Sequence, residues 1–465
     1  MRRLTVVFAL LVIVAAGVWV GAGFMAGPAI EIAKPERWVG AATPVDIVID
    51  SPGGALASLA VAFEQDGTRT PLYEATGGVS AVQAPDSAGA PVTLEPDGRI
   101  RVQRQISRES VPGLKAGAAR IVVTASRPVV YGIRQVSAEA SRDVEVRLER
   151  PRISVLSTHH YINQGGTEVV LYRVTPDDVE SGVTVGDVEY PGYPASGAAF
   201  DDVRIQDPSV RIAFFALLWN QDPAAPIRLY ARDPAGNAAR ADFEHRVFPK
   251  TFRRSRIELN DPFLERVVPA ILAGTDEVKP EGALIDQYVV INSELRRKNA
   301  EKIASFAAQT SPEWLWGGTV FHAFANNAVE SAFADSRTYV YQGREVDHQT
   351  HLGFDLASYA QTPIVAANRG RIVYAAELGI YGNCVIIDHG MGLQSLYAHL
   401  SAIDVQVGDA VEKEQVLGRS GITGLAGGDH LHFTMLVNGQ MVNPVEWWDP
   451  HWIEDRILRK IRAAR

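Results

Sequence analysis

Four histidines and one aspartate in the last third of this 465-residue chain have types and spacing suited to metal chemistry. They lie in three short segments, His351-Leu-Gly-Phe-Asp355, Tyr397-Ala-His399-Leu400 and His430-Leu-His432-Phe433. Zn²⁺ binds imidazole nitrogen and carboxylate oxygen at tetrahedral corners, and a catalytic zinc site typically uses three protein ligands and leaves one position to water. These five side chains therefore predict a zinc hydrolase site, with two histidines beyond the ligand set.

The spacing of His430 and His432 predicts that both rings lie on one side of a strand. Alternate side chains share a face on a β-strand, so Leu431 and Phe433 are expected to point into a core instead. Taken alone, a His-x-His pair also fits two structural polar residues. This pair follows a glycine-rich run, residues 421–428, whose backbone can turn tightly beside an ion or a substrate.

From about residue 323 to Trp448 the chain resembles the lysostaphin or LytM-type zinc endopeptidases, which cut peptidoglycan cross-bridges. The segments that carry the resemblance keep the family's order: Ser331–Arg337, His351–Asp355, Pro363–Ala367, Gly370–Val373, Tyr381–Gly390, Tyr397–Ser401, Val407–Val411, the glycine-rich run and His430–Phe433. The resemblance implies a small antiparallel β domain with a groove for an extended peptide.

The resemblance also implies a role for each of the five side chains. It assigns His351, Asp355 and His432 to zinc, and His399 and His430 to a catalytic pair. That pair would orient the attacking water, move its proton and hydrogen-bond the developing oxyanion, which suits imidazole near its ordinary pKa. The order in which the two histidines act stays open.

The glycine-rich loop and the strand after it depart from the commonest family pattern. Asp429 stands where many relatives have Pro, Gly427 where they have Thr or Ser, and Thr434 where they have Glu. None of the three is a zinc ligand, so the departures bear on substrate preference rather than on metal binding.

The sequence predicts a zinc-dependent endopeptidase that hydrolyses peptide cross-bridges of peptidoglycan. The main alternative is a non-enzymatic LytM-type regulator, which would bind and activate another cell-wall hydrolase through the same groove. Some relatives of that kind have lost one or more of the five residues, whereas this chain keeps all five. A second alternative is an enzyme that cleaves a protein instead of the wall, and no regulatory partner can be named.

Five other residues in this region have simpler interpretations. We expect His348 to be a solvated loop residue or a partner of a metal ligand, and His389 to be structural within a hairpin turn. Tyr381 and Tyr397 could line the groove or contact an oxyanion, although packing is the usual role of aromatic residues in strands. Cys384 precedes an apolar run and is expected to be buried.

The N-terminus predicts the compartment. Two arginines precede Thr5–Gly27, an uncharged run of 23 residues, long enough to cross a hydrocarbon core of about 30 Å. We expect residues 1–29 to form a retained single-pass transmembrane anchor, with a cleaved signal peptide as the alternative. Either way, the chain after about Ile30 would be extracytoplasmic, facing the periplasm or the cell wall.

Composition limits the remaining possibilities. With 46% hydrophobic and 21% charged residues, the chain has room for about three or four folded domains. A net charge of −9 argues against nucleic acid as a partner, because nucleic-acid-binding proteins are usually basic. The single cysteine excludes an intramolecular disulfide.

The pattern as a whole predicts a mainly β, multidomain protein. Runs such as Arg120–Thr124 and Thr167–Tyr172 are β-branched and typical of strands in modules that serve as spacers or binding arms. The expected parts after the anchor are a β-sandwich-like module (35–150), an immunoglobulin-like β module (151–250), a helical linker or regulatory segment (255–316), the LytM-type peptidase domain (320–448) and a basic C-terminal helix (449–465).

Within the helical segment, two helix starts are expected. Asp261 and the proline after it open the first, and Asn292 or Ser293 caps the second with Glu294 in its first turn. We expect residues 260–316 to pack beside the groove, and carry as an alternative that they cover it and hold the enzyme latent.

Overall fold

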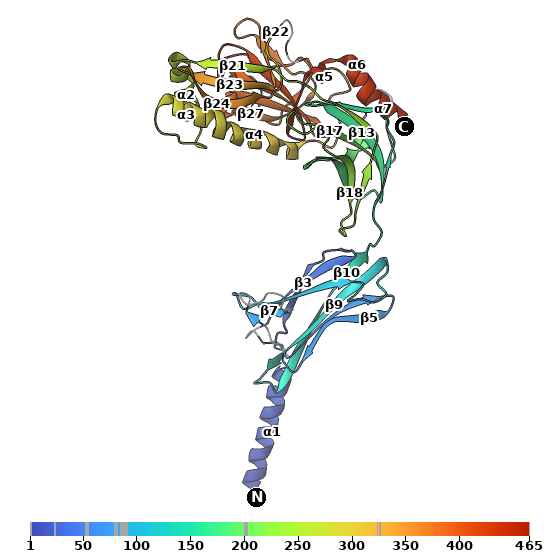
Figure 1. Ribbon diagram of the computed structural model, residues 1–465. Coiled ribbons are helices and arrows are strands. Elements are labelled where there is room, and N and C mark those ends of the chain that lie inside the picture. Colours follow the sequence, from blue (N-terminus) through green and yellow to red (C-terminus); the bar gives the residue numbers. More distant parts are fainter. Residues whose placement is uncertain are drawn as a thin grey trace. The chain divides into compact units, whose positions relative to one another are not determined.

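The computed structural model describes residues 2–22, 25–51, 55–78, 82–83, 92–199, 203–322, 324 and 327–464 (Figure 1). The chain divides into two compact units. Unit 1 comprises Met1–Arg150 with Arg232–Ala238, and unit 2 comprises Pro151–Ala231 with Ala239–Arg465. Both units are mainly β, as the sequence predicts.

Unit 1 begins with helix α1, Arg2–Ala22. Among the residues that the structure describes, no helix is both long and apolar enough to cross a membrane. The single-pass anchor expected over residues 1–29 therefore stays a prediction from the sequence.

The rest of unit 1 is a β-sandwich. Its two sheets pack through an apolar core that includes Ile47, Phe63 and Ile121, each with at most 1% of its surface exposed. One sheet has the strand order β1 (Ala29–Lys34), β3 (Ala42–Asp50), β8 (Ile100–Ser107), β7 (Val92–Leu94) and β6 (Val82–Gln83); the other has the order β2 (Trp38–Val39), β10 (Arg134–Val146), β9 (Gly117–Val129), β4 (Ser58–Gln65) and β5 (Thr68–Thr76).

Unit 2 opens with further β-sheets. Their strands are β11 (Arg152–Val155), β13 (Thr167–Thr175), β17 (Val210–Ala216) and β16 (Tyr193–Pro194) in one sheet, β15 (Val188–Pro191), β14 (Glu180–Val185), β18 (Ile227–Arg232) and β19 (Ala238–Asp242) in another, and β12 (His160–Asn163) with β20 (His245–Phe248) in a third. These sheets share one continuous core with the C-terminal sheets of unit 2, which the sequence did not reveal.

The segment expected to be helical starts instead with a strand, β21 (Arg254–Leu259). This strand pairs in parallel with β23 (Asp335–Tyr341), which pairs with β24 (Arg344–His351). Helix α2 (Asp261–Gly274) then begins at the predicted residue, because the side chain of Asn260 accepts a hydrogen bond from the backbone N–H of Phe263.

The predicted cap of the second helix is wrong. Asn292 lies inside a π-helical turn, Ile291–Leu295, between α3 (Leu284–Val290) and α4 (Arg296–Ser305), so the helix runs on through this position. Asn292 is buried, and its side chain donates to Asp347 at 2.7 Å instead of capping a helix. A polar residue mid-sequence looks like a cap when its tertiary partner is unknown.

The C-terminal region of unit 2 is built on a largely buried antiparallel sheet. Its strand order is β22 (Ala328–Ser331), β25 (Phe354–Ala357), β33 (Leu431–Val437), β29 (Leu393–Leu400), β28 (Asn383–Gly390), β27 (Gly370–Glu377) and β31 (Ala410–Val411), with β34 (Gln440–Val442) beside β33. A second sheet contains β26 (Pro363–Val365), β32 (Val416–Arg419) and β30 (Ala402–Ile403).

The chain ends in short helical turns that pack against the rest of unit 2. They are α5 (Val445–Trp448), α6 (Pro450–Ile453), the π-helical turn Glu454–Leu458 and α7 (Arg459–Ala463). Ile457 and Ile461 are fully buried, so the apolar side of this basic helix is covered within unit 2.

Candidate metal centre

Three of the five candidate residues converge on one point. His351 ends β24, Asp355 lies on β25 and His432 lies on β33, where Asp355 and His432 are direct cross-strand partners. Oδ1 of Asp355 is 2.8 Å from Nε2 of His351 and 3.1 Å from Nδ1 of His432, and the two nitrogens are 2.9 Å apart. All three side chains are buried. The register of β25 and β33 places Asp355 beside His432, and the short turn from β24 into β25 brings His351 to them.

These three donor atoms form a group that could hold a metal ion. Nδ1 of His351 faces the carbonyl oxygen of Ala332 at 3.2 Å, so this nitrogen carries the proton and Nε2 presents a lone pair. Two imidazole nitrogens and a carboxylate oxygen at such short separations place lone pairs against one another, and a cation between them removes that conflict. The donor set of two nitrogens and one oxygen fits zinc.

His399 and His430 lie beside this group, with ring centroids 4.8 Å apart. Each donates Nδ1–H to a carbonyl oxygen of the glycine-rich loop at 2.8 Å, His399 to Thr423 and His430 to Gly428. This leaves Nε2 of each ring as the nitrogen available for chemistry. His399 has a φ of +64°, a left-handed backbone that is uncommon outside glycine and that re-aims its side chain at the end of β29.

The two rings differ in proton affinity. Burial lowers the pKa of His399 well below its ordinary value, and neighbouring His430 and His432 lower it further. Burial alone would also lower the pKa of His430, but hydrogen bonding and attraction to Asp355 outweigh burial and raise it.

The site opens into a cavity of about 890 Å³. All five candidate residues line it, so His430 and His432 do share one side of their strand. Strand β21 and helix α2, which precede the C-terminal sheets in the sequence, form another wall of the cavity. Arg266 of α2 donates to the carbonyl oxygen of Ala426 at 2.7 Å, which ties this helix to the glycine-rich loop.

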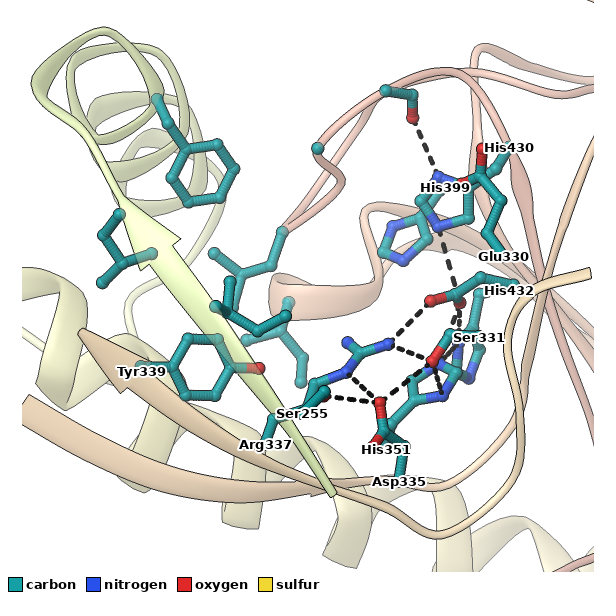
Figure 2. A pocket seen from close by; sticks show the side chains of 18 of the residues that line it. Ser255, Glu330, Ser331, Asp335, Arg337, Tyr339, His351, His399, His430 and His432 are labelled. Atoms are coloured by element: carbon teal, nitrogen blue, oxygen red, sulfur yellow. Dashed lines mark hydrogen bonds and ion pairs between the residues drawn. The ribbon is translucent and has the colours of Figure 1, made fainter. Parts of the chain in front are cut away.

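A second layer of polar contacts supports the carboxylate (Figure 2). Nη2 of Arg337 donates to Oδ2 of Asp355 at 2.9 Å and to Oγ of Ser331 at 2.7 Å. Asp335 receives a hydrogen bond of 2.7 Å from Ser255 and lies 3.6 Å from Nε of Arg337. Sequence reasoning gave these residues no role; the one available signal was the alternation of Asp335 and Arg337 on a single strand face.

The other candidates separate into structural and peripheral residues. His348 is exposed on β24, a strand rather than the expected loop. His389 is buried on β28 just before the turn and donates Nδ1–H to the carbonyl oxygen of Arg369. The hydroxyl oxygen of Tyr397 accepts hydrogen bonds from the backbone N–H of Ala367 and from Oγ of Ser395. Cys384 is buried, as predicted.

Tyr381 is the one of the two tyrosines that lines the cavity. Its ring centroid is 5.6 Å from that of His432, and burial raises the pKa of its hydroxyl to about 12. The hydroxyl points to the sulfur of Met441 at 3.8 Å, so in this structure it packs instead of contacting the donor group.

Comparison with known proteins agrees with the geometry. Residues 349–444 match peptidase family M23. The chain is 44% identical over 95 residues to the DD-carboxypeptidase/endopeptidase Mpg of Neisseria meningitidis serogroup B, covering 20% of this chain and 22% of that protein. It is 38% identical over 96 residues to the peptidoglycan DD-endopeptidase ShyA of Vibrio cholerae, covering 21% of this chain and 22% of that protein.

Among solved structures, the catalytic domain of lysostaphin from Staphylococcus simulans is 28% identical, with 27% of this chain and 96% of that chain covered and a TM-score of 0.23. The chain spans about a fifth of the length of the curated relatives named above. The family match identifies an M23 peptidase domain at residues 349–444 and confirms the family resemblance predicted from the motifs.

Proposed function

We propose that this chain is a zinc-dependent endopeptidase that hydrolyses peptide cross-bridges of peptidoglycan. The observation that carries the proposal is the convergence of His351, Asp355 and His432, with His399 and His430 at the same cavity. The names of the M23 relatives Mpg and ShyA support peptide bonds of peptidoglycan as the substrate class.

The proposed ligands are Nε2 of His351, Oδ1 of Asp355 and Nδ1 of His432. A zinc ion bound there would supply Lewis-acid chemistry, activating water near neutral pH and polarising a peptide carbonyl. Nε2 of His399 and of His430 can each take a proton from the attacking water or, once protonated, donate a hydrogen bond to the developing oxyanion. The carbonyl oxygens of the glycine-rich loop hold both rings in place for this work.

The test is release of soluble muropeptides from purified peptidoglycan by the full chain. We expect release by the unmutated protein and its loss in His430→Ala, with zinc content unchanged in that variant. The rival function, a non-enzymatic regulator, would leave both proteins without activity of their own and would show only as a stimulated rate when another wall hydrolase is added. Cleavage of added protein substrates without release from peptidoglycan would favour the third possibility.

We further propose that the N-terminal helix anchors the chain in a membrane and leaves the chain after about Ile30 extracytoplasmic. Support comes from the uncharged run Thr5–Gly27 and from the exposure of apolar side chains such as Phe8 and Ile13 on α1. In membranes prepared from cells that express the full chain, we expect the protein to resist a carbonate wash. Complete release by that wash would contradict the anchor.

A further inference from the structure

The candidate metal centre is supported by residues that precede 349–444, the range that matches the peptidase family, and one of them, Ser255, also precedes the longer region that resembles it in sequence. Ser255, Ser331, Asp335 and Arg337 all precede residue 349, where the family match begins. Three come from the sheet formed by β21, β23 and β24, in which Ser255 and Arg337 are direct partners between parallel strands. This sheet therefore places one polar strand face against the ligands (Figure 2).

Arg337 determines which oxygen of Asp355 faces the histidines. Its Nη2 donates to Oδ2 at 2.9 Å, while Oδ1 lies within 3.1 Å of the donor nitrogens of His351 and His432. A carboxylate held at one oxygen cannot exchange its two oxygens by rotation about the bond to its β-carbon. The guanidinium thus sets the plane of the carboxylate and leaves Oδ1 for a metal.

The same nitrogen also steadies a second ligand. Nη2 of Arg337 donates to Oγ of Ser331 at 2.7 Å, and that oxygen is 3.3 Å from Nδ1 of His351. One arginine therefore contacts the carboxylate ligand directly and an imidazole ligand through a single hydroxyl.

The orientation of Arg337 depends in turn on β21. Asp335, with 2% of its surface exposed, lies 3.6 Å from Nε of Arg337 and accepts a hydrogen bond of 2.7 Å from Ser255. Burying a carboxylate is costly unless hydrogen bonds or a nearby cation replace its lost hydration, and Ser255 and Arg337 do this for Asp335. Strand β21 is thus joined to the ligands by a continuous polar path from Ser255 through Asp335 and Arg337 to Asp355.

We propose that Arg337 is a positioning residue of the metal site and that β21, through Ser255 and Asp335, is a working part of that site. The inference rests on the proposed metal role of His351, Asp355 and His432. It also gives β21 a supporting role in the peptidase. This strand directly precedes residues 260–316, which were considered for packing beside the groove or covering it.

The test is zinc affinity of the purified full chain, measured by competition with a chromophoric chelator, for four variants. We expect Arg337→Met to weaken zinc binding about tenfold to a hundredfold, as when a partner of a metal ligand is removed elsewhere. Arg337→Lys should recover part of this loss, because its ammonium keeps the charge but ends about one bond short of Nη2. Ser255→Ala should weaken zinc binding about threefold to tenfold, which corresponds to the net contribution of one hydrogen bond. Arg344→Met, at an exposed position on the same hairpin, should match the unmutated chain.

The visible spectrum of the cobalt-loaded chain separates positioning from folding. We expect the ligand-field bands to shift in Arg337→Met and to stay unchanged in Arg344→Met, with circular dichroism checking the fold. If Arg337→Met lowered thermal stability but held zinc within twofold of the unmutated chain with an unchanged cobalt spectrum, the proposal would be overturned. If Arg337→Met failed to fold, unchanged zinc affinity in both Arg337→Lys and Ser255→Ala would overturn it. A chain that binds zinc as expected but releases no muropeptides would refute the proposed function and leave this inference standing.

Discussion

A buried ion pair joins the C-terminal helix to the β module of residues 151–250, and breaking it tests how strongly the two are held together. Nζ of Lys460 donates to Oε1 of Glu168 at 2.7 Å and to the carbonyl oxygen of Val169 at 3.0 Å. Their side chains are 6% and 0% exposed. Removing one member of such a pair leaves an uncompensated buried charge and costs about 3–5 kcal/mol. We therefore expect Lys460→Met to lower the free energy of unfolding of unit 2 by that amount.

The loss should depend on pH in a defined direction. Burial raises the pKa of Glu168, and Lys460 counteracts this rise. The pKa of Glu168 should therefore be higher still in Lys460→Met. A carboxyl whose folded-state pKa is raised destabilises the fold when ionised, and this cost disappears as pH falls towards its ordinary value of about 4.3. The deficit should be full at pH 8 and smaller at pH 5. His160, Arg456 and Glu446 also act on this pair, and they are present in both proteins.

The assay is urea unfolding of the full chain, followed by tryptophan fluorescence. Arg459→Met is the matched control, because Arg459 pairs with Asp455 at 2.7 Å on an exposed surface and should cost less than about 1 kcal/mol. The double variant Lys460→Met with Glu168→Gln should recover most of the loss. A cost below about 1 kcal/mol at pH 8 for Lys460→Met would refute the reasoning.

Three further substitutions test the site. Gly353→Ala would place a Cβ 2.5 Å from Nε2 of His432, so we expect loss of bound zinc, measured by atomic emission, and zinc at the unmutated level would contradict the geometry. His399→Ala should keep zinc and slow muropeptide release by about a hundredfold or more, and a rate within threefold of the unmutated chain would exclude its catalytic role. Arg266→Gln removes the tie from α2 to Ala426, and we expect release to slow by about tenfold because the loop that holds both catalytic rings loosens. A faster rate in that variant would instead favour α2 as a cover that holds the enzyme latent.

The convergence of the candidate ligands could be predicted because these residues lie in short local patterns. Strand alternation is enough to place His430 and His432 on one side, and the structure shows both at the cavity. The motif from His351 to Asp355 needs only one turn of chain between two strands to bring both donors together.

Contacts between segments far apart in the chain could not be predicted from the sequence. The pairing of Ser255 with Arg337 joins strands that lie about eighty residues apart, and nothing local to either residue marks it. An aromatic cluster likewise joins the β module of residues 151–250 to the peptidase domain. The ring of Trp316 is centred 5.8 Å from that of Trp447, which is centred 6.0 Å from that of Phe214. The sequence predicted separate modules, whereas in the structure buried residues from both belong to one hydrophobic core.

Isolated cross-linked muropeptide dimers, incubated with the purified full chain and analysed by mass spectrometry, test the central claim most directly. We expect each dimer to gain one water molecule and separate into two monomers with a new amine and a new carboxylate. Chelation should stop the reaction and added zinc should restore it. Intact dimers in the presence of a zinc-loaded, folded chain would contradict the proposed hydrolysis of peptide cross-bridges.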